Sequence, residues 1–170
     1  MVADIEFCRK LSRYHGDIQP RLVMLSKDGR LFLNDILSYT PSNEDGYQRV
    51  MNSTTYISPL SPEAVEQVNK KVLQPQYDTN KNDVFAIAVT VLCCCSEPST
   101  VGQGLNSIYR KSGGQLTINF QTIENALNHM TNKQSRSPTL VNALRIMLSE
   151  RESDRPTLYQ ILEFMRVASA

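Results

Sequence analysis

Residues 15–37, HGDIQPRLVMLSKDGRLFLNDIL, carry more information about the fold than any other part of the chain. Two short apolar runs, residues 22–25 and 31–33, flank an Asp-Gly pair. This pair between apolar runs is a strong hairpin signal, because glycine tolerates the left-handed backbone that tight turns require. The sequence therefore predicts a small β-hairpin over residues 21–35.

Outside this hairpin, the periodicity of the apolar residues is mainly that of helices. Helical spacing or helix-start signals occur in residues 2–11, 61–72, 84–95, 120–130, 140–148 and 158–167. Polar or glycine- and proline-containing stretches, which predict loops, occupy residues 38–60, 74–82 and 97–114, with one helical turn at 105–109. Because no repeat or second-domain boundary interrupts this pattern, we expect one domain over residues 1–170, mainly α with a small β-hairpin.

The composition is that of a globular protein with no strong electrostatic preference. Of 170 residues, 41% are hydrophobic, and 18 Lys and Arg against 17 Asp and Glu leave a net charge of +1. Such a chain has no field to attract nucleic acid or an anionic membrane. The longest apolar run, residues 84–95, would form a helix about 18 Å long, shorter than a hydrocarbon core of about 30 Å. We expect a helix buried on all sides, and neither nucleic acid binding nor membrane insertion.

The cysteines and the N-terminal segment indicate a reducing, intracellular compartment such as the cytoplasm. The segment has no apolar stretch of signal-peptide length. Consecutive cysteines at 93–95 point about 100° apart on a helix, so they cannot bind one metal ion together. We expect them and Cys8 to be reduced and to pack as small apolar core residues. His15 and His129 are the two histidines, so no histidine-rich metal site is expected.

The first part of segment 15–37 resembles the catalytic loop of the protein kinases. Residues 15–25 resemble H-R-D-x-K-P-x-N followed by an apolar strand. Asp35 lies where the metal-binding D-F-G of the family is expected, 18 residues after Asp17 (35 − 17). The predicted hairpin fills that interval, as it does in the family.

Three further segments resemble kinase signatures in the same order and at similar spacing. Residues 55–63 resemble the A-P-E signature that ends the activation segment, and residues 82–89 the start of the central C-lobe helix. Residues 154–162 resemble the arginine-bearing end of that lobe. The resemblance covers about residues 5–165 and implies a helical domain like the C-terminal lobe of a protein kinase.

The resemblance places Asp17, with His15, at the family's catalytic positions and Asp35 at its metal-binding position. The family's neighbouring side chains are replaced at Gly16, Gln19, Leu22 and Leu37. Gly16 stands for the arginine that holds a phosphorylated activation loop, Gln19 for the lysine against the transferring phosphate, and Leu22 for an asparagine that binds Mg²⁺. The resemblance thus implies a degenerate site without a catalytic, cofactor-binding or metal-binding role.

A kinase also needs an N-lobe with a glycine-rich phosphate loop, a strand lysine and a helix glutamate. The chain contains no Gly-x-Gly-x-x-Gly, and its first residues correspond to the helix before the catalytic loop. We therefore expect the N-lobe to be absent from this chain.

The structural side chains of the family are better represented. The resemblance implies that Asp83 accepts backbone N–H bonds from residues 15–17 and holds that loop in shape. It also implies an ion pair between Arg155 and Glu63, if residues 61–63 are the A-P-E equivalent. If residues 56–60 are the equivalent instead, Leu60 replaces the glutamate and the pair is lost. We favour Glu63 and expect Glu63→Ala and Arg155→Ala to destabilise similarly and non-additively.

The leading functional hypothesis is a non-catalytic, pseudokinase-like scaffold, a structural subunit of a larger assembly that binds protein partners and needs no cofactor. A lone C-lobe would expose the face that an N-lobe covers. The candidates for that face are the apolar residues Val2, Ile5, Leu22, Met24 and Ile36, for which the alternative is an ordinary place in the core.

Two alternatives remain open at this point. The chain could be a fragment or split part of a protein Ser/Thr kinase, with an N-lobe supplied elsewhere; Asp17 would then be catalytic, and Asp35 would bind the metal of Mg-ATP. A weaker hypothesis is phosphate-controlled docking through residues 53–55, for which the sequence identifies no receiving cation. The plain interpretation of residues 53–55 is a solvated loop.

Overall fold

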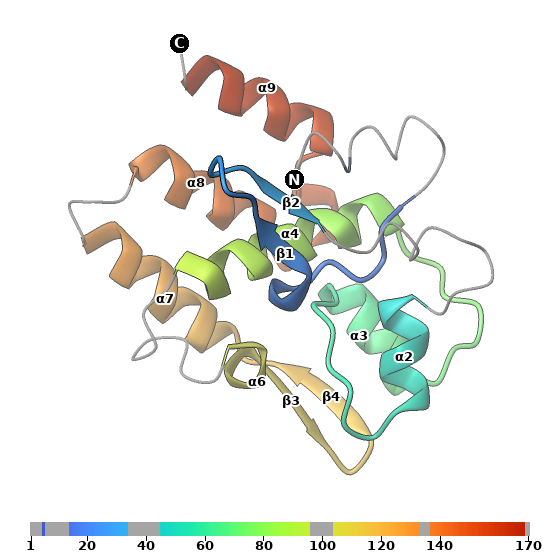
Figure 1. Cartoon of the computed structure of the whole chain (residues 1–170). Coiled ribbons are helices and arrows are strands. Elements are labelled where there is room, and N and C mark those ends of the chain that lie inside the picture. Colours follow the sequence, from blue (N-terminus) through green and yellow to red (C-terminus); the bar gives the residue numbers. More distant parts are fainter. Residues whose placement is uncertain (1–4, 6–13, 34–44, 96–103, 133–136, 169–170) are drawn as a thin grey trace.

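The computed structural model describes residues 5, 14–33, 45–95, 104–132 and 137–168. These residues form a mainly helical structure with two small antiparallel hairpins (Figure 1). In chain order the elements are η1 (Pro20–Leu22), β1 (Val23–Leu25), β2 (Leu31–Leu33), α2 (Gly46–Asn52), α3 (Pro62–Asn69), α4 (Thr79–Cys95), α6 (Leu105–Ile108), β3 (Tyr109–Ser112), β4 (Gln115–Ile118), α7 (Phe120–Asn132), α8 (Pro138–Met147), η3 (Glu152–Asp154) and α9 (Leu158–Ala168).

The first hairpin, β1–β2, is confirmed. Met24 pairs with Phe32 and Leu25 pairs with Leu31 across the two strands. The turn depends on Gly29, whose φ of +81° lies in the left-handed region that favours glycine. The position of the Asp-Gly pair therefore determines where the chain reverses.

Helix α4 runs through the middle of the molecule and contacts η1, α7 and α8 (Figure 1). All residues from 82 to 90 are buried, as expected of a run that is apolar on every side. The helix begins earlier than the predicted residue 84, because the Asp78 carboxylate accepts the N–H groups of Asn80 (2.8 Å) and Lys81 (3.2 Å). Asp83, which precedes the predicted bounds 84–95, consequently lies inside the helix.

The prediction that the consecutive cysteines are core residues is confirmed only in part, since Cys93 and Cys95 pack against the core from its edge. Cys94 is exposed, and Cys93 and Cys95 are only half-buried, because the last turn of α4 is incompletely covered. All three are free thiols, and burial raises the pKa of Cys93 to about 12. The remaining cysteine, Cys8, lies outside the described residues.

Two elements lie where the sequence predicts loops. Helix α2 falls within the predicted loop 38–60; Asp45 caps it by accepting the Gln48 N–H at 2.9 Å. The β3–β4 hairpin begins within the predicted loop 97–114 and extends to residue 118, and it turns at two exposed glycines with φ of 58° and 80°. Both elements are too short to produce a clear periodic signal.

The remaining described elements agree with the sequence. Helices α3, α7, α8 and α9 form in the expected segments. Thr157 caps α9, since its hydroxyl accepts the Gln160 N–H at 3.2 Å. Of the expected helix over residues 2–11, only Ile5 is described, in helical conformation. Within the described residues, no helix has both the length and the apolar character needed to cross a bilayer.

Candidate functional site

Asp83 anchors the loop of residues 15–17 from the central helix. Its two carboxylate oxygens accept the backbone N–H groups of His15 (2.7 Å) and Gly16 (2.9 Å), and all three residues are buried. Gly16 has φ +76°, which a side chain would strain. Burial raises the pKa of Asp83 to about 7, although the two hydrogen bonds oppose this shift. The hydrogen bonds expected of Asp83 are therefore present.

Every acceptor position of the Asp17 carboxylate is occupied. One oxygen accepts from Gln19 Nε2 (2.6 Å) and Ser58 Oγ (2.7 Å). The other accepts from Tyr56 Oη (2.7 Å) and Arg49 Nη1 (3.0 Å). An ionised carboxylate offers about four lone-pair positions. Because the Asp17 side chain is also fully buried, no acceptor position remains for another molecule.

The donors around Asp17 are themselves connected in a network. The Tyr56 hydroxyl accepts from Gln19 Nε2 and Arg21 Nη2, both at 2.8 Å, while it donates to Asp17. Arg21 Nε also donates to Gln19 Oε1 at 2.7 Å, and its guanidinium lies 5.6 Å from the centre of the Tyr56 ring. The network thus extends from the buried Asp17 carboxylate and Gln19 to the partly exposed Tyr56 and Arg21, and its buried members would be costly to leave unpaired.

Helix α2 packs against the loop of residues 15–17 and covers the Asp17 carboxylate. The Gly46 N–H donates to Gly16 O at 2.9 Å. A Cβ on Gly46 would lie 2.5 Å from Ser58 Oγ, 2.6 Å from Gly16 O and 2.9 Å from Asp17 Oδ1. Only glycine permits this close approach of the helix to the loop. Arg49, on the same helix, reaches the Asp17 carboxylate.

Glu63 and Arg155 form a second, separate anchor. Arg155 Nη2 donates to Glu63 Oε1, and the arginine side chain is fully buried. Its guanidinium also donates to the carbonyls of Ser149 (3.1 Å) and Lys81 (3.3 Å), and lies 5.5 Å from the Phe85 ring centre. Of the two alternatives for the A-P-E equivalent, Glu63 is the one that pairs with Arg155, while Leu60 is a fully buried core residue.

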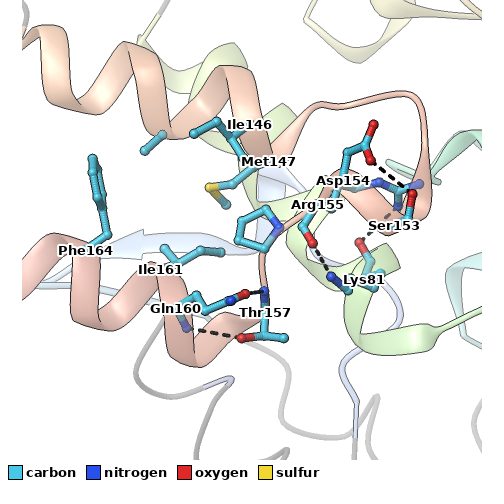
Figure 2. A pocket seen from close by; sticks show the side chains of 12 residues that line it. Lys81, Ile146, Met147, Ser153, Asp154, Arg155, Thr157, Gln160, Ile161 and Phe164 are labelled. Carbon is cyan, nitrogen blue, oxygen red and sulfur yellow. Dashed lines mark hydrogen bonds between the residues drawn. The ribbon is translucent and has the colours of Figure 1, made fainter.

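A groove of about 580 Å³ lies beside this anchor, between α8 and α9. Figure 2 shows Ile161 and Phe164 of α9 across from Ile146 and Met147 of α8. Half of Ile146 and 43% of Phe164 are exposed, so the apolar wall is open to solvent. Lys81 closes one end by donating to the backbone oxygen of Arg155.

The structure brings some of the expected site residues together and separates others. Grouped around the loop are His15, Gly16, Asp17, Gln19 and Asp83. Leu22 is buried one turn further on, in η1, and Glu63 with Arg155 forms the separate anchor. Asp35, with Ile36 and Leu37, lies outside the described residues.

Sequence reasoning missed three partners of Asp17, namely Arg49, Tyr56 and Ser58. They lie in or near the segment predicted to be a loop, 32, 39 and 41 residues away from Asp17. A buried aspartate needs hydrogen-bond donors, and the polar segment 38–60 contains several of them. This was the one indication in the sequence that the segment supplies partners for Asp17.

Comparison with known proteins adds no relative to this geometry. No protein-family model matches the chain, and no curated protein matches it. Among the described residues, no group of three His, Cys, Asp or Glu side chains gathers as metal ligands. Any functional proposal therefore depends on the residues and contacts of this chain.

The Glu63–Arg155 anchor predicts unequal, non-additive effects of truncation. Arg155→Ala should lower the free energy of unfolding by about 3–5 kcal/mol, because it leaves three partly buried acceptors and a ring without their buried partner. Glu63→Ala should cost less, since the guanidinium keeps its carbonyl partners and Glu63 is 24% exposed. The double variant should resemble Arg155→Ala in urea unfolding. Additive losses would contradict the pairing. The unequal costs expected from these contacts differ from the similar costs expected from the sequence, and the same urea titration distinguishes the two predictions.

The close approach of α2 predicts the sign of a second substitution. Alanine is a better helix former than glycine by about 1 kcal/mol, so at an open helix position Gly→Ala stabilises. Gly46→Ala should instead lower the free energy of unfolding by about 1–3 kcal/mol, because its Cβ would overlap the loop. The control is Gln48→Ala on the exposed face of α2, which should be neutral in the same urea titration. A stabilised Gly46→Ala would show that α2 does not pack on the loop.

Proposed function

We propose that this chain is a non-catalytic, pseudokinase-like module, similar to the C-terminal lobe of a protein kinase, that binds protein partners as a structural subunit of an assembly. The observation that carries the proposal is the fully occupied and buried Asp17 carboxylate. A catalytic aspartate in phosphoryl transfer must accept the proton of the substrate hydroxyl. Asp17 has no acceptor position left with which to do so.

The residues next to Asp17 support the same proposal. Gln19, at the position of the phosphate-binding lysine, uses both hydrogens of its amide group on Asp17 and Tyr56. Leu22, at the position of the metal-binding asparagine, is a buried apolar residue. These side chains stabilise the loop, and neither offers a charge or an oxygen to Mg-ATP. The proposed module therefore needs no cofactor.

The exposed apolar surface overlaps only in part with the residues considered from the sequence. Of those residues, Ile5 and Leu22 are core residues, whereas Met24 is exposed. Exposed apolar side chains lie on both faces of the β1–β2 hairpin, at Met24 (43%), Leu25 (68%), Leu31 (56%) and Phe32 (43%). Val2 and Ile36 lie outside the described residues.

An apolar, two-stranded hairpin is weakly stable when both of its faces meet water. Exposed apolar patches of this kind are typical of protein interaction sites. The open groove between α8 and α9 adds a second apolar surface. Both surfaces support a protein partner better than a nucleic acid, for which the described residues offer no basic stripe along these elements.

The alternative, a split kinase completed by an N-lobe from another chain, needs a rearrangement. Tyr56, Ser58 and Arg49 would have to leave Asp17 before a substrate hydroxyl could approach it. Each donor removed would leave a buried charge less well paired, which costs several kcal/mol. The occupied site therefore favours the non-catalytic role.

The non-catalytic role predicts the result of nucleotide titration. Isothermal calorimetry of the full chain with ATP should show no heat that depends on Mg²⁺. The reason is that Gln19 and Leu22 replace the lysine that would contact the phosphate and the asparagine that would bind Mg²⁺. Asp17→Asn should give the same flat trace. Tight Mg²⁺-dependent binding that disappears in Asp35→Ala would overturn the proposal in favour of the split kinase.

The binding role predicts the native mass. Purified from its own cells under gentle conditions, the chain should appear in native mass spectrometry as part of a complex heavier than its own 19.2 kDa. Phe32→Asp should release the chain as a monomer with an unchanged circular dichroism spectrum, because the ring is exposed and a charge there opposes apolar contact. The matched control, Asn125→Asp on the exposed face of α7, should remain in the complex. A stable, soluble wild-type monomer would contradict the role.

A further inference from the structure

A second pocket, of about 630 Å³, lies away from Asp17. Its walls come from three segments: the chain that leaves α2, the end of α3, and the tip of the β3–β4 hairpin. Figure 1 shows the chain after α2 passing this hairpin before it reaches α3. Lys111 joins the two, because its ammonium group donates to the carbonyls of Val50 and Ser53.

Two lysines that no carboxylate neutralises line this pocket. In the described part of the chain, neither Lys71 nor Lys111 has an acidic partner, and the described lining contains no aspartate or glutamate. The neighbouring Lys70, by contrast, pairs with Glu66 and does not line the pocket. The pocket thus carries positive charge that the fold leaves unbalanced.

The backbone at Lys71 is unusual for a lysine. It has φ +56°, and it ends α3 with the hydrogen bonds from Lys71 N to Val68 O (2.9 Å) and from Val72 N to Gln67 O (3.0 Å). At this position of a helix end, glycine is the favoured residue, because a side chain costs about 1 kcal/mol in this conformation. A residue that carries such strain is a reason to seek a function for its side chain.

Neutral hydrogen-bonding groups complete the lining. Thr54 and Ser112 are exposed and supply hydroxyl groups, and Gly113 and Gly114 let a ligand approach the backbone closely. A phosphate monoester has a charge of about −1.5 to −2 at neutral pH and three strong acceptor oxygens. Two lysines beside hydroxyl groups therefore suit a phosphate ligand better than they suit a ligand with a single carboxylate.

We propose that this pocket binds the phosphate group of a phosphorylated serine or threonine on a partner protein. The volume is that of a site for a side chain and its neighbours, and larger than one phosphate group requires. The proposal differs from phosphate-controlled docking through residues 53–55, because here the phosphate belongs to the partner and Lys71 and Lys111 of this chain receive it. It rests on the proposed binding function, since it names the chemistry of a partner, but it uses neither Asp17 nor the β1–β2 hairpin.

The test uses a blocked tripeptide, acetyl-Gly-phosphothreonine-Gly-amide, and the full chain labelled with ¹⁵N. Its amide signals are followed by NMR as the peptide is added, with the threonine and glutamate tripeptides as controls. We expect saturable shifts at Gly113 and Gly114 with the phosphopeptide and none with threonine. Binding should weaken as salt is raised, because exposed charges carry it.

Three variants separate binding from folding. Lys71→Gly should weaken binding about fivefold to tenfold, and yet raise the melting temperature by about 2–4 °C, because glycine relieves the strained backbone. Lys111→Gln, which retains a donor for the α2 carbonyls, should weaken binding by a similar factor. Lys70→Ala, the matched control, should bind as the wild type does.

Several results would overturn the proposal: no saturable shift, equal binding of the glutamate peptide, or an equal loss in Lys70→Ala and Lys71→Gly. If the phosphopeptide fails while Phe32→Asp still releases the native complex, the phosphate pocket is wrong and the binding function stands. If the phosphopeptide binds and the native chain is a monomer, the pocket stands and the scaffold role fails.

Discussion

The buried carboxylate of Asp83 is the constraint on which the loop side of the molecule depends. It sits inside the central helix, and its two oxygens accept consecutive N–H groups of the loop at 2.7 and 2.9 Å. A buried carboxylate is costly unless it is hydrogen-bonded, and the buried loop amides also cost free energy without an acceptor. Helix and loop therefore need one another, and the backbone of the loop that carries Asp17 is held by a residue, Asp83, that does not donate to the Asp17 carboxylate.

Asp17 then organises the segments around it. Donors from residues 19, 49, 56 and 58 meet on its two oxygens, so one buried charge joins the loop, α2 and the chain before α3. The same saturation that stabilises this arrangement leaves no free acceptor on the Asp17 carboxylate. Gly46 contributes to the arrangement, because its missing Cβ allows α2 to pack closely against the loop.

Much of the fold was predictable, because long periodic segments and a turn pair carry local information. The β1–β2 hairpin and helices α3, α7, α8 and α9 follow from such signals, and the resemblance anticipated the contacts of Asp83 and Arg155. Helix α2 was not predictable in this way, since a seven-residue helix has little periodicity and depends on its packing against the loop. The partners of Asp17 were missed for a related reason: they are distant in sequence, and only the folded chain brings them together.

The two hairpins show how similar local structures serve different purposes. In β3–β4, Tyr109 and Leu116 are buried, and the Tyr109 hydroxyl donates to Leu60 O at 2.8 Å, so this hairpin is held in the core. It can therefore present Lys111 at a fixed position. In β1–β2 the paired side chains Met24 and Phe32 remain exposed. A rigid hairpin suits recognition of a charge, whose energy depends on distance, whereas an uncovered apolar hairpin gains stability from whatever protein surface covers it.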